Sequence, residues 1–219
     1  MRFLVQFRKV GTAAYISHLD LMRTMQRTLR RANIPMCYSQ GFNPHPILSF
    51  AMASPVGMTS YAEYMDVKVE EGADAMEMTQ SLIAALPDGL SVVRTCMVED
   101  NYPPLMAKVA LCDCSITFPD KKNIESTWDE FMAQDEILVQ KHSKKGLRTV
   151  DIKPMILQHK VQDNSISLRL CAGSAANLSP TLLAQAFCDF AKYEPDFRCL
   201  QRALLAGDRE EPKDLFELV

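Results

Sequence analysis

Four arginines stand close together near the N-terminus, at the spacing of one helix face. Arg23, Arg27, Arg30 and Arg31 follow each other at i, i+4, i+7 and i+8, which at about 100° per residue places them on one side of a helix. No glutamate lies between them to form the i, i+4 pairs that usually neutralise such a face. Because a guanidinium fits phosphate oxygens, the pattern predicts an anion-binding helix, with a plain solvated face as the alternative.

A loop rich in turn residues follows these arginines, at residues 38–46. Prolines on both sides of His45 restrict its backbone, and its imidazole can exchange a proton near neutral pH. The rings of Tyr38 and Phe42 could stack on a nucleic-acid base. A structured turn with a locally hydrogen-bonded histidine is the alternative. We predict that the arginines bind nucleic acid or another anion together with Gln40, Gly41, Phe42, Asn43 and His45.

Three side chains are candidates for acid–base chemistry: His45, His18 and Tyr38. His18 lies just inside the start of the predicted helix, where the helix dipole would lower its pKa. A meeting of His18 with His45 would suit a metal-independent RNA endonuclease. His18 and Asp20 are two residues apart on a helix and diverge, so we expect no metal site. We assign no catalytic residue and expect no cofactor.

Composition and missing motifs exclude several classes of protein. The chain lacks a phosphate-binding G-x-x-x-x-G-K-[ST] loop, a G-x-G-x-x-G fingerprint and a G-x-S-x-G nucleophile motif. The seven cysteines form no C-x-x-x-C-x-x-C array for an iron–sulfur cluster, and we expect reduced thiols. The sequence has no apolar run long enough to span a bilayer, so we expect a cytoplasmic protein with no membrane association.

Charge is distributed unevenly along the chain. Residues 1–62 hold seven arginine and lysine residues against one aspartate, which gives this part a formal charge of +6. The whole chain of 219 residues nevertheless carries −3. A basic first part on an acidic protein indicates an anionic partner, either nucleic acid or an acidic protein surface.

The elements that position these residues alternate between strands and helices. Residues 2–9 alternate as a half-buried strand, and Ser17 caps a helix that runs to about residue 32. The order strand, helix, strand, strand, helix, strand follows to residue 98, and the same order is expected in the second half. We predict an α+β fold of two ferredoxin-like (βαββαβ) modules with antiparallel sheets. The first, at 1–100, carries the arginine helix and the His45 loop, and the second, at 101–219, ends in an acidic tail.

Residues 15–23, with the arginines that follow, and the loop at 38–46 resemble the bacterial radical SAM-linked protein family. The likeness is dense over residues 2–70 and weaker at 150–154 and 177–180, and we take it to cover essentially the whole chain. It implies a domain of otherwise unknown function. Such domains occur beside a radical SAM protein with a cobalamin-binding-type domain, or fused C-terminally to it. The partner would carry the iron–sulfur cluster that this chain lacks.

These observations favour a non-catalytic accessory protein that binds substrate for a radical SAM enzyme. RNA, such as transfer or ribosomal RNA, would lie against the arginine helix and the loop. One alternative is a metal-independent RNA endonuclease that uses His45 with His18 or Tyr38. Another is a protein-docking module, in which the arginine face binds an acidic patch of the radical SAM partner.

Overall fold

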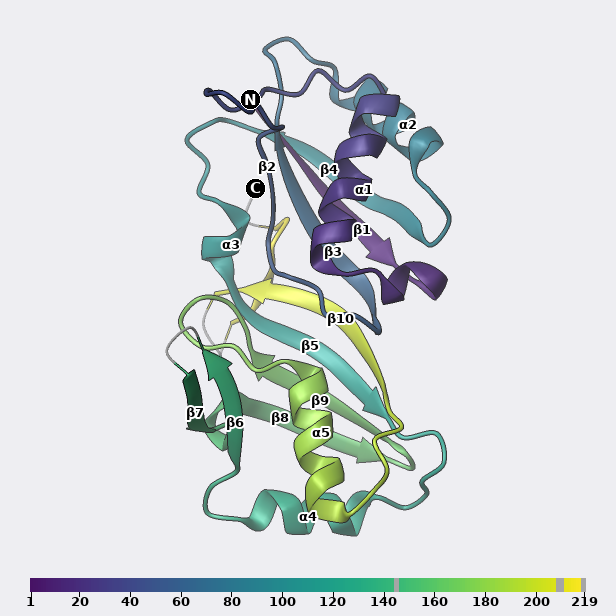
Figure 1. Ribbon diagram of the computed structural model, residues 1–219, viewed down its shortest axis with the longest axis vertical. Coiled ribbons are helices and arrows are strands. Elements are labelled where there is room, and N and C mark those ends of the chain that lie inside the picture. The colour runs from purple at the N-terminus through teal and green to yellow at the C-terminus, as the bar shows by residue number, and fades with distance from the viewer. Residues whose placement is uncertain (144–145, 208–210, 218–219) are drawn as a thin grey trace.

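The protein is a mixed α+β molecule with a mostly antiparallel sheet (Figure 1). The computed structural model describes residues 1–143, 146–207 and 211–217. The strands are β1 (Arg2–Lys9), β2 (Leu48–Phe50), β3 (Met58–Lys68), β4 (Leu90–Val98), β5 (Val109–Thr117), β6 (Leu138–Ser143), β7 (Gly146–Asp151), β8 (Ile156–Gln162), β9 (Ser165–Cys171), β10 (Arg198–Ala206) and β11 (Lys213–Asp214). The α-helices are α1 (His18–Arg31), α2 (Ala75–Ala85), α3 (Leu105–Lys108), α4 (Glu125–Ala133) and α5 (Pro180–Ala191), with short 3₁₀ turns η1 (Gly11–Tyr15) and η2 (Lys153–Met155).

Both halves of the chain order their strands in the same way. In the first half the neighbours are β4-β1-β3-β2, and every pair is antiparallel. In the second half the neighbours are β10-β5-β9-β8, again with every pair antiparallel. In each half, the first strand therefore lies between the fourth and the third strand of that half. This order is compatible with two ferredoxin-like modules.

The two halves share one sheet, because β3 and β10 pair in parallel. Cys199, Leu200 and Gln201 of β10 lie beside Met58, Thr59 and Ser60 at the start of β3. The other end of β3 pairs with the short strand β2, from Leu48↔Val67 to Phe50↔Met65. β3 thus has different neighbours along its two halves, and nine strands form a single sheet in the described part of the chain.

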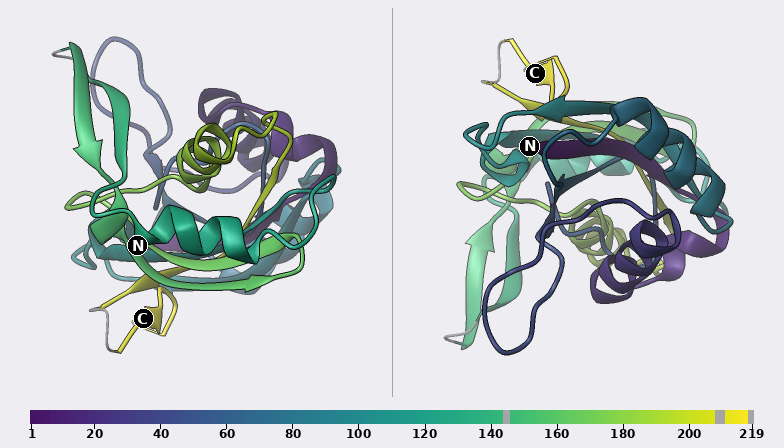
Figure 2. Two further views of the ribbon diagram at one scale, coloured as in Figure 1. Left: turned by 90° about the horizontal axis from the view of Figure 1, so that it is seen from below. Right: turned by 90° about the horizontal axis from the view of Figure 1, so that it is seen from above.

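The helices cover one face of this sheet. Figure 2 shows α1 and α5 on the same side, while the C-terminal segment lies on the opposite side. In the first half, Phe3, Val5 and Phe7 of β1 face the buried stripe of α1. In the second half, Trp128 and Phe187 form the centre of an aromatic core. The face away from the helices carries the alternate residues of each strand.

The second half also carries a hairpin outside the nine-stranded sheet. Its strands β6 and β7 pair antiparallel, with a register that runs from Leu138↔Asp151 to Ser143↔Gly146. Residues 144–145 lie outside the described part. The predicted tail at 207–219 is described only in part, with 208–210 and 218–219 outside it, and its residues 213–214 pair with β10.

Candidate nucleic-acid interface

Helix α1 presents the four arginines from the helix-covered side of the sheet. Its start is fixed by Ser17, whose Oγ accepts a hydrogen bond from the Asp20 backbone N–H at 3.2 Å. Leu21, Met25 and Leu29 are buried against the sheet at helical spacing, which turns the opposite side of α1 to solvent. The cap predicted at Ser17 is confirmed.

All four arginines are exposed, but they differ in their partners. Arg23 forms an ion pair with Asp20 at 3.1 Å. Arg31 donates to the carbonyl of Ala85 at 2.8 Å and so ties α1 to the end of α2. Within the described residues, Arg27 and Arg30 have no side-chain hydrogen bond or ion pair. These two guanidinium groups are therefore available to an external anion.

The loop at 38–46 is closed at its base by backbone and side-chain bonds. Tyr38 and Pro46 form an isolated β-bridge, and the Ser39 N–H donates to the His45 carbonyl at 2.9 Å. The Ser39 hydroxyl accepts from the His45 N–H at 3.1 Å and lies 2.9 Å from His45 Nδ1. These contacts fix the imidazole with one ring nitrogen engaged, which leaves Nε2 for another partner.

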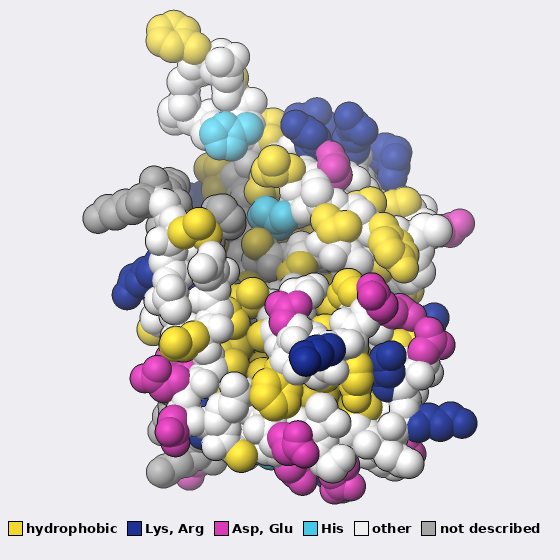
Figure 3. Space-filling model, turned by 60° about the horizontal axis from the view of Figure 1, so that its bottom comes forward, with side chains coloured by type: hydrophobic (Ala, Val, Ile, Leu, Met, Phe, Trp, Pro, Cys, Tyr) yellow, Lys and Arg dark blue, Asp and Glu magenta, His cyan; other side chains and the backbone are white. Residues whose placement is uncertain are grey.

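The tip of this loop offers an aromatic ring to solvent. The side chain of Phe42 is fully exposed, and Gln40, Gly41 and Asn43 beside it are exposed as well. Gly41 has φ +129°, a conformation that L side chains rarely adopt. In Figure 2 this segment projects on the same side of the sheet as α1, and Figure 3 shows Lys and Arg side chains gathered at one end of that face.

His18 is held apart from the loop. Its ring packs edge-on against Phe50, with centroids 5.5 Å apart, and its buried Nδ1 has no hydrogen-bond partner in the described part of the chain. Burial, and then the charge of Lys9, lower the pKa of His18 below its ordinary value. Within the described residues no hydrogen bond or ring contact joins His18 to His45. Tyr38 is half exposed at the base of the loop.

A buried polar cluster lies beside His18, and the motif search did not identify it. It consists of Lys9, Ser54, Ser60 and Glu63, all fully or almost fully buried. Lys9 Nζ donates to the carbonyls of Ala14 at 3.4 Å and Pro55 at 3.2 Å. The sequence did contain a signal: Lys9 continues the inward series Phe3, Val5 and Phe7, where a charged residue is unusual.

Burial controls the protonation of this cluster. It raises the pKa of Glu63 and lowers the pKa of Lys9, while the attraction between the two groups opposes both shifts. Ser54 Oγ and Glu63 Oε1 have no hydrogen-bond partner among the residues that the structure describes, although the Ser60 and Ser54 hydroxyls lie near enough to lower the pKa of Glu63. Through Lys9 the cluster joins β1 to the carbonyls of Ala14 and Pro55, and its unpaired buried oxygens cost some folding free energy.

Comparison with known proteins places these features in a family. Residues 2–180 match a family described as an uncharacterized protein conserved in bacteria (DUF2344). The chain belongs to this family. The matched part includes α1, the loop at 38–46 and the Lys9 cluster, and it ends at the start of α5. No curated protein matched the chain in the search.

Two further findings bear on the class of site. Among the described residues, no three His, Cys, Asp or Glu side chains lie together in a group that could hold a metal ion. In the same part of the chain, no helix has the length and apolar character needed to cross a membrane.

Proposed function

We propose that this protein binds RNA as an accessory protein of a radical SAM enzyme, through α1 and the loop at 38–46. The observation that carries the proposal is the pair Arg27 and Arg30, two exposed guanidinium groups that make no hydrogen bond or ion pair with the described residues. They belong to α1, which lies on the same side of the sheet as the loop segment in Figure 2, and this loop exposes Phe42 fully.

Arginines of this kind suit a phosphate backbone. A guanidinium can donate two parallel hydrogen bonds to one phosphate, and each neutralised phosphate releases a counterion. Arg31 is engaged by Ala85 and Arg23 by Asp20, so Arg27 and Arg30 are expected to contribute most of the binding. The affinity should then fall steeply with salt.

The loop suits an unpaired nucleotide better than a duplex. A fully exposed phenylalanine offers a stacking surface to an unstacked base, and the base edge can be read by nearby donors such as His45 Nε2. Because His45 Nδ1 is engaged by Ser39, and because no contact joins His45 to His18 among the described residues, the geometry favours binding over acid–base cleavage.

The radical SAM enzyme enters through the resemblance of residues 15–46 to radical SAM-linked proteins. In this proposal that partner supplies the iron–sulfur cluster and the radical chemistry, while the present chain holds the RNA. Copurification of a radical SAM protein from cells that express the tagged chain would support this part. If the chain is recovered alone and still binds RNA, the proposed partner would be wrong, and the proposed RNA site would stand.

The test is RNA binding by Arg27→Ala/Arg30→Ala across a salt series. Filter binding with total cellular RNA should show weaker binding than wild type and a salt slope reduced by about two, roughly one unit for each lost phosphate contact. Arg198→Ala/Arg202→Ala removes two exposed arginines from β10 and is the matched control. Phe42→Ala should weaken binding to single-stranded RNA by about tenfold.

Other outcomes would redirect the proposal. Equal loss in the test and control variants would indicate an unspecific effect of net charge. Unchanged RNA binding together with loss of the radical SAM partner would instead indicate that the arginine face docks on a protein. Either result contradicts an RNA site on α1.

A further inference from the structure

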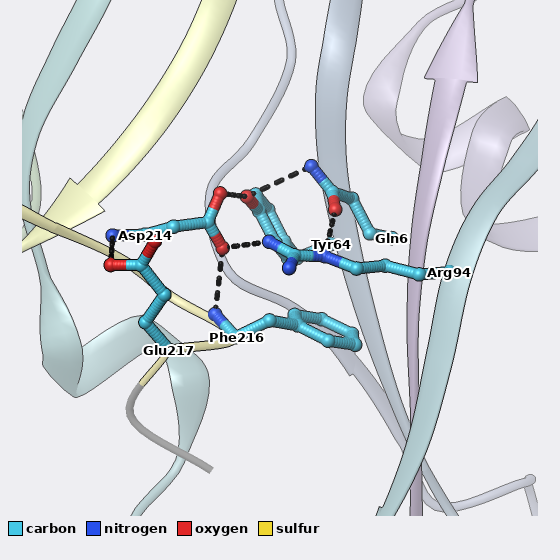
Figure 4. Close-up of polar contacts among 6 residues, drawn as sticks. All are labelled: Gln6, Tyr64, Arg94, Asp214, Phe216 and Glu217. Carbon is cyan, nitrogen blue, oxygen red and sulfur yellow. Dashed lines mark hydrogen bonds and ion pairs between the residues drawn. The ribbon is translucent and has the colours of Figure 1, made fainter.

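The C-terminal segment crosses the sheet face that the helices leave open. Residues 213–214 form β11, which pairs antiparallel with Leu205 and Ala206 of β10. Leu215 is fully buried, and it anchors the segment in the core. From this anchor, Asp214 and Phe216 reach side chains that rise from β1, β3 and β4 (Figure 4).

The carboxylate of Asp214 is bound by donors of the sheet. The Tyr64 hydroxyl donates to Asp214 Oδ2 at 3.2 Å, and Arg94 forms an ion pair with Oδ1. Gln6 links the two donors, because its amide donates to the Tyr64 oxygen at 3.0 Å and accepts from Arg94 Nε at 2.6 Å. Burial raises the pKa of Tyr64, so this hydroxyl stays protonated and remains a donor.

The ring of Phe216 is held by the same two residues. The Arg94 guanidinium carbon lies 4.7 Å from its centroid, and the Tyr64 ring lies 5.7 Å from it. The backbone N–H of Phe216 also donates to the Asp214 carboxylate at 2.8 Å. The sheet therefore binds the negative charge of Asp214 and the flat ring of Phe216 side by side, and one residue separates the two in the chain.

The open face carries a second cation–ring pair that the segment leaves uncovered. Arg8 follows Gln6 by two residues on β1, so both side chains point to this face. Its guanidinium lies 5.6 Å from the centroid of the Tyr61 ring, and both residues are exposed. An arginine beside an aromatic ring thus occurs twice along one sheet face, Arg8 with Tyr61 and Arg94 with Phe216 of the segment, an arrangement that suits stacked bases and their phosphates.

We propose that this face, formed by Gln6, Arg8, Tyr61, Tyr64 and Arg94, is a second binding site, for nucleotides of single-stranded RNA. The C-terminal segment occupies part of it as a competitor. Asp214 takes the place of a phosphate on Arg94 and Tyr64, and Phe216 takes the place of a base. This site lies on the opposite side of the sheet from α1, and it does not depend on the arginine helix.

The test weakens the contacts of the C-terminal segment with this face and leaves its buried residue Leu215 unchanged. Asp214→Asn/Phe216→Ala is made in the full chain that also carries Arg27→Ala/Arg30→Ala, so that α1 contributes little. The probe is a fluorescent single-stranded RNA of about eight nucleotides, within the usual size of such sites. We expect about a tenfold gain in affinity, and we expect Arg94→Ala to abolish that gain. Glu136→Gln/Phe190→Ala, which removes one charge and one partly exposed ring elsewhere, should leave the affinity unchanged.

Circular dichroism must show that each variant keeps the wild-type spectrum. Should Asp214→Asn/Phe216→Ala unfold, a synthetic peptide of residues 211–217 gives a second measurement. Added to the Arg27→Ala/Arg30→Ala chain that keeps Asp214 but also carries Phe216→Ala, it should compete with the RNA probe. No gain in affinity by a folded variant would overturn the proposal. Peptide binding without RNA binding would also overturn it, and would make the face a site for acidic aromatic peptides. Neither result affects the α1 site, because α1 is disabled in this background.

Discussion

Four arginines share one face of α1, yet their contacts give them different roles. Arg31 stabilises the packing of α1 against α2, Arg23 forms an exposed ion pair with Asp20, and Arg27 and Arg30 make no hydrogen bond or ion pair with the described residues. The spacing was sufficient to predict the face, because helical periodicity is local. The division of roles depends on Ala85, which lies 54 residues away in the chain, and periodicity does not contain that information.

Lys9 and Glu63 were less visible in the sequence, although both occupy inward positions of alternating strands. Lys9 follows Phe7 by two residues, and Glu63 precedes Met65 by two. Strand alternation therefore predicts that both side chains are buried. The same pattern does not predict that they approach each other, because the pairing of β1 with β3 is long-range and shifts in register between Phe7 and Lys9.

At the residue scale, the lowered pKa of His18 predicts a pH-dependent stability. The unfolded chain, with its ordinary value of 6.5, binds the proton more tightly than the folded protein. The contribution of neutral His18 is therefore complete above that value and is lost as pH falls below it. The difference in unfolding free energy between wild type and His18→Gln should shrink from about pH 7.5 to about pH 5, as measured by urea titration.

The matched control for this experiment is His45→Gln, which replaces an exposed imidazole held only by its own loop. A constant difference between wild type and His18→Gln across the same pH range would contradict the assigned role of burial and Lys9.

At the scale of elements, the helix starts show which capping bonds the local sequence predicts and which it does not. Ser17 and Asp74 cap α1 and α2 as their sequence positions predict, with acceptor distances of 3.2 Å and 2.7 Å. Ser179 precedes Pro180 at the start of α5, yet its hydroxyl bonds the Thr181 side chain at 2.6 Å and makes no capping bond to the described residues. Pro180 at the first helical position still supplies the backbone angle with which a helix begins.

The centre of α5 should be the most sensitive point of the second core. The ring of Phe187 is fully buried and contacts the rings of Phe118, Trp128, Phe131 and Tyr193. Phe187→Ala should lower the free energy of unfolding by about 3–5 kcal/mol, because it removes buried surface and leaves a cavity. Urea denaturation followed by circular dichroism measures this loss.

Phe190 provides the comparison on the same helix, since it is 37% exposed and contacts Phe131 alone among these rings. Phe190→Ala should cost clearly less than Phe187→Ala. Equal losses at the two positions would mean that α5 packs in a different way.

At the scale of the whole molecule, the sequence indicated the order of elements in each half but not how the halves join. Their pairing through β3 and β10 joins residues about 140 positions apart, and no turn signal or periodicity marks it. Gln201 is the clearest trace of this junction. It is buried, and its amide donates to Ser60 Oγ at 3.0 Å and to the Ala62 carbonyl at 2.8 Å.

The joined sheet predicts that the two halves support each other. Gln201→Leu would remove the side-chain donor to the Ala62 carbonyl and one of the two donors to the Ser60 hydroxyl, so it should destabilise the protein by about 1–3 kcal/mol. Gln162→Leu, an exposed position at the end of β8, should change stability by no more than about 0.5 kcal/mol. Two separate unfolding transitions in wild type, with only one sensitive to Gln201→Leu, would contradict this coupling.

The central claim is that RNA lies on α1 and the loop at 38–46, and crosslinking in living cells tests it most directly. Ultraviolet light would join RNA to the tagged wild-type chain, and mass spectrometry would locate the crosslinked peptides. We predict that crosslinks concentrate in residues 17–46, above all at Phe42, and that Arg27→Ala/Arg30→Ala reduces them. Recovery of the chain without RNA, or with crosslinks only outside residues 17–46, would contradict the proposed site.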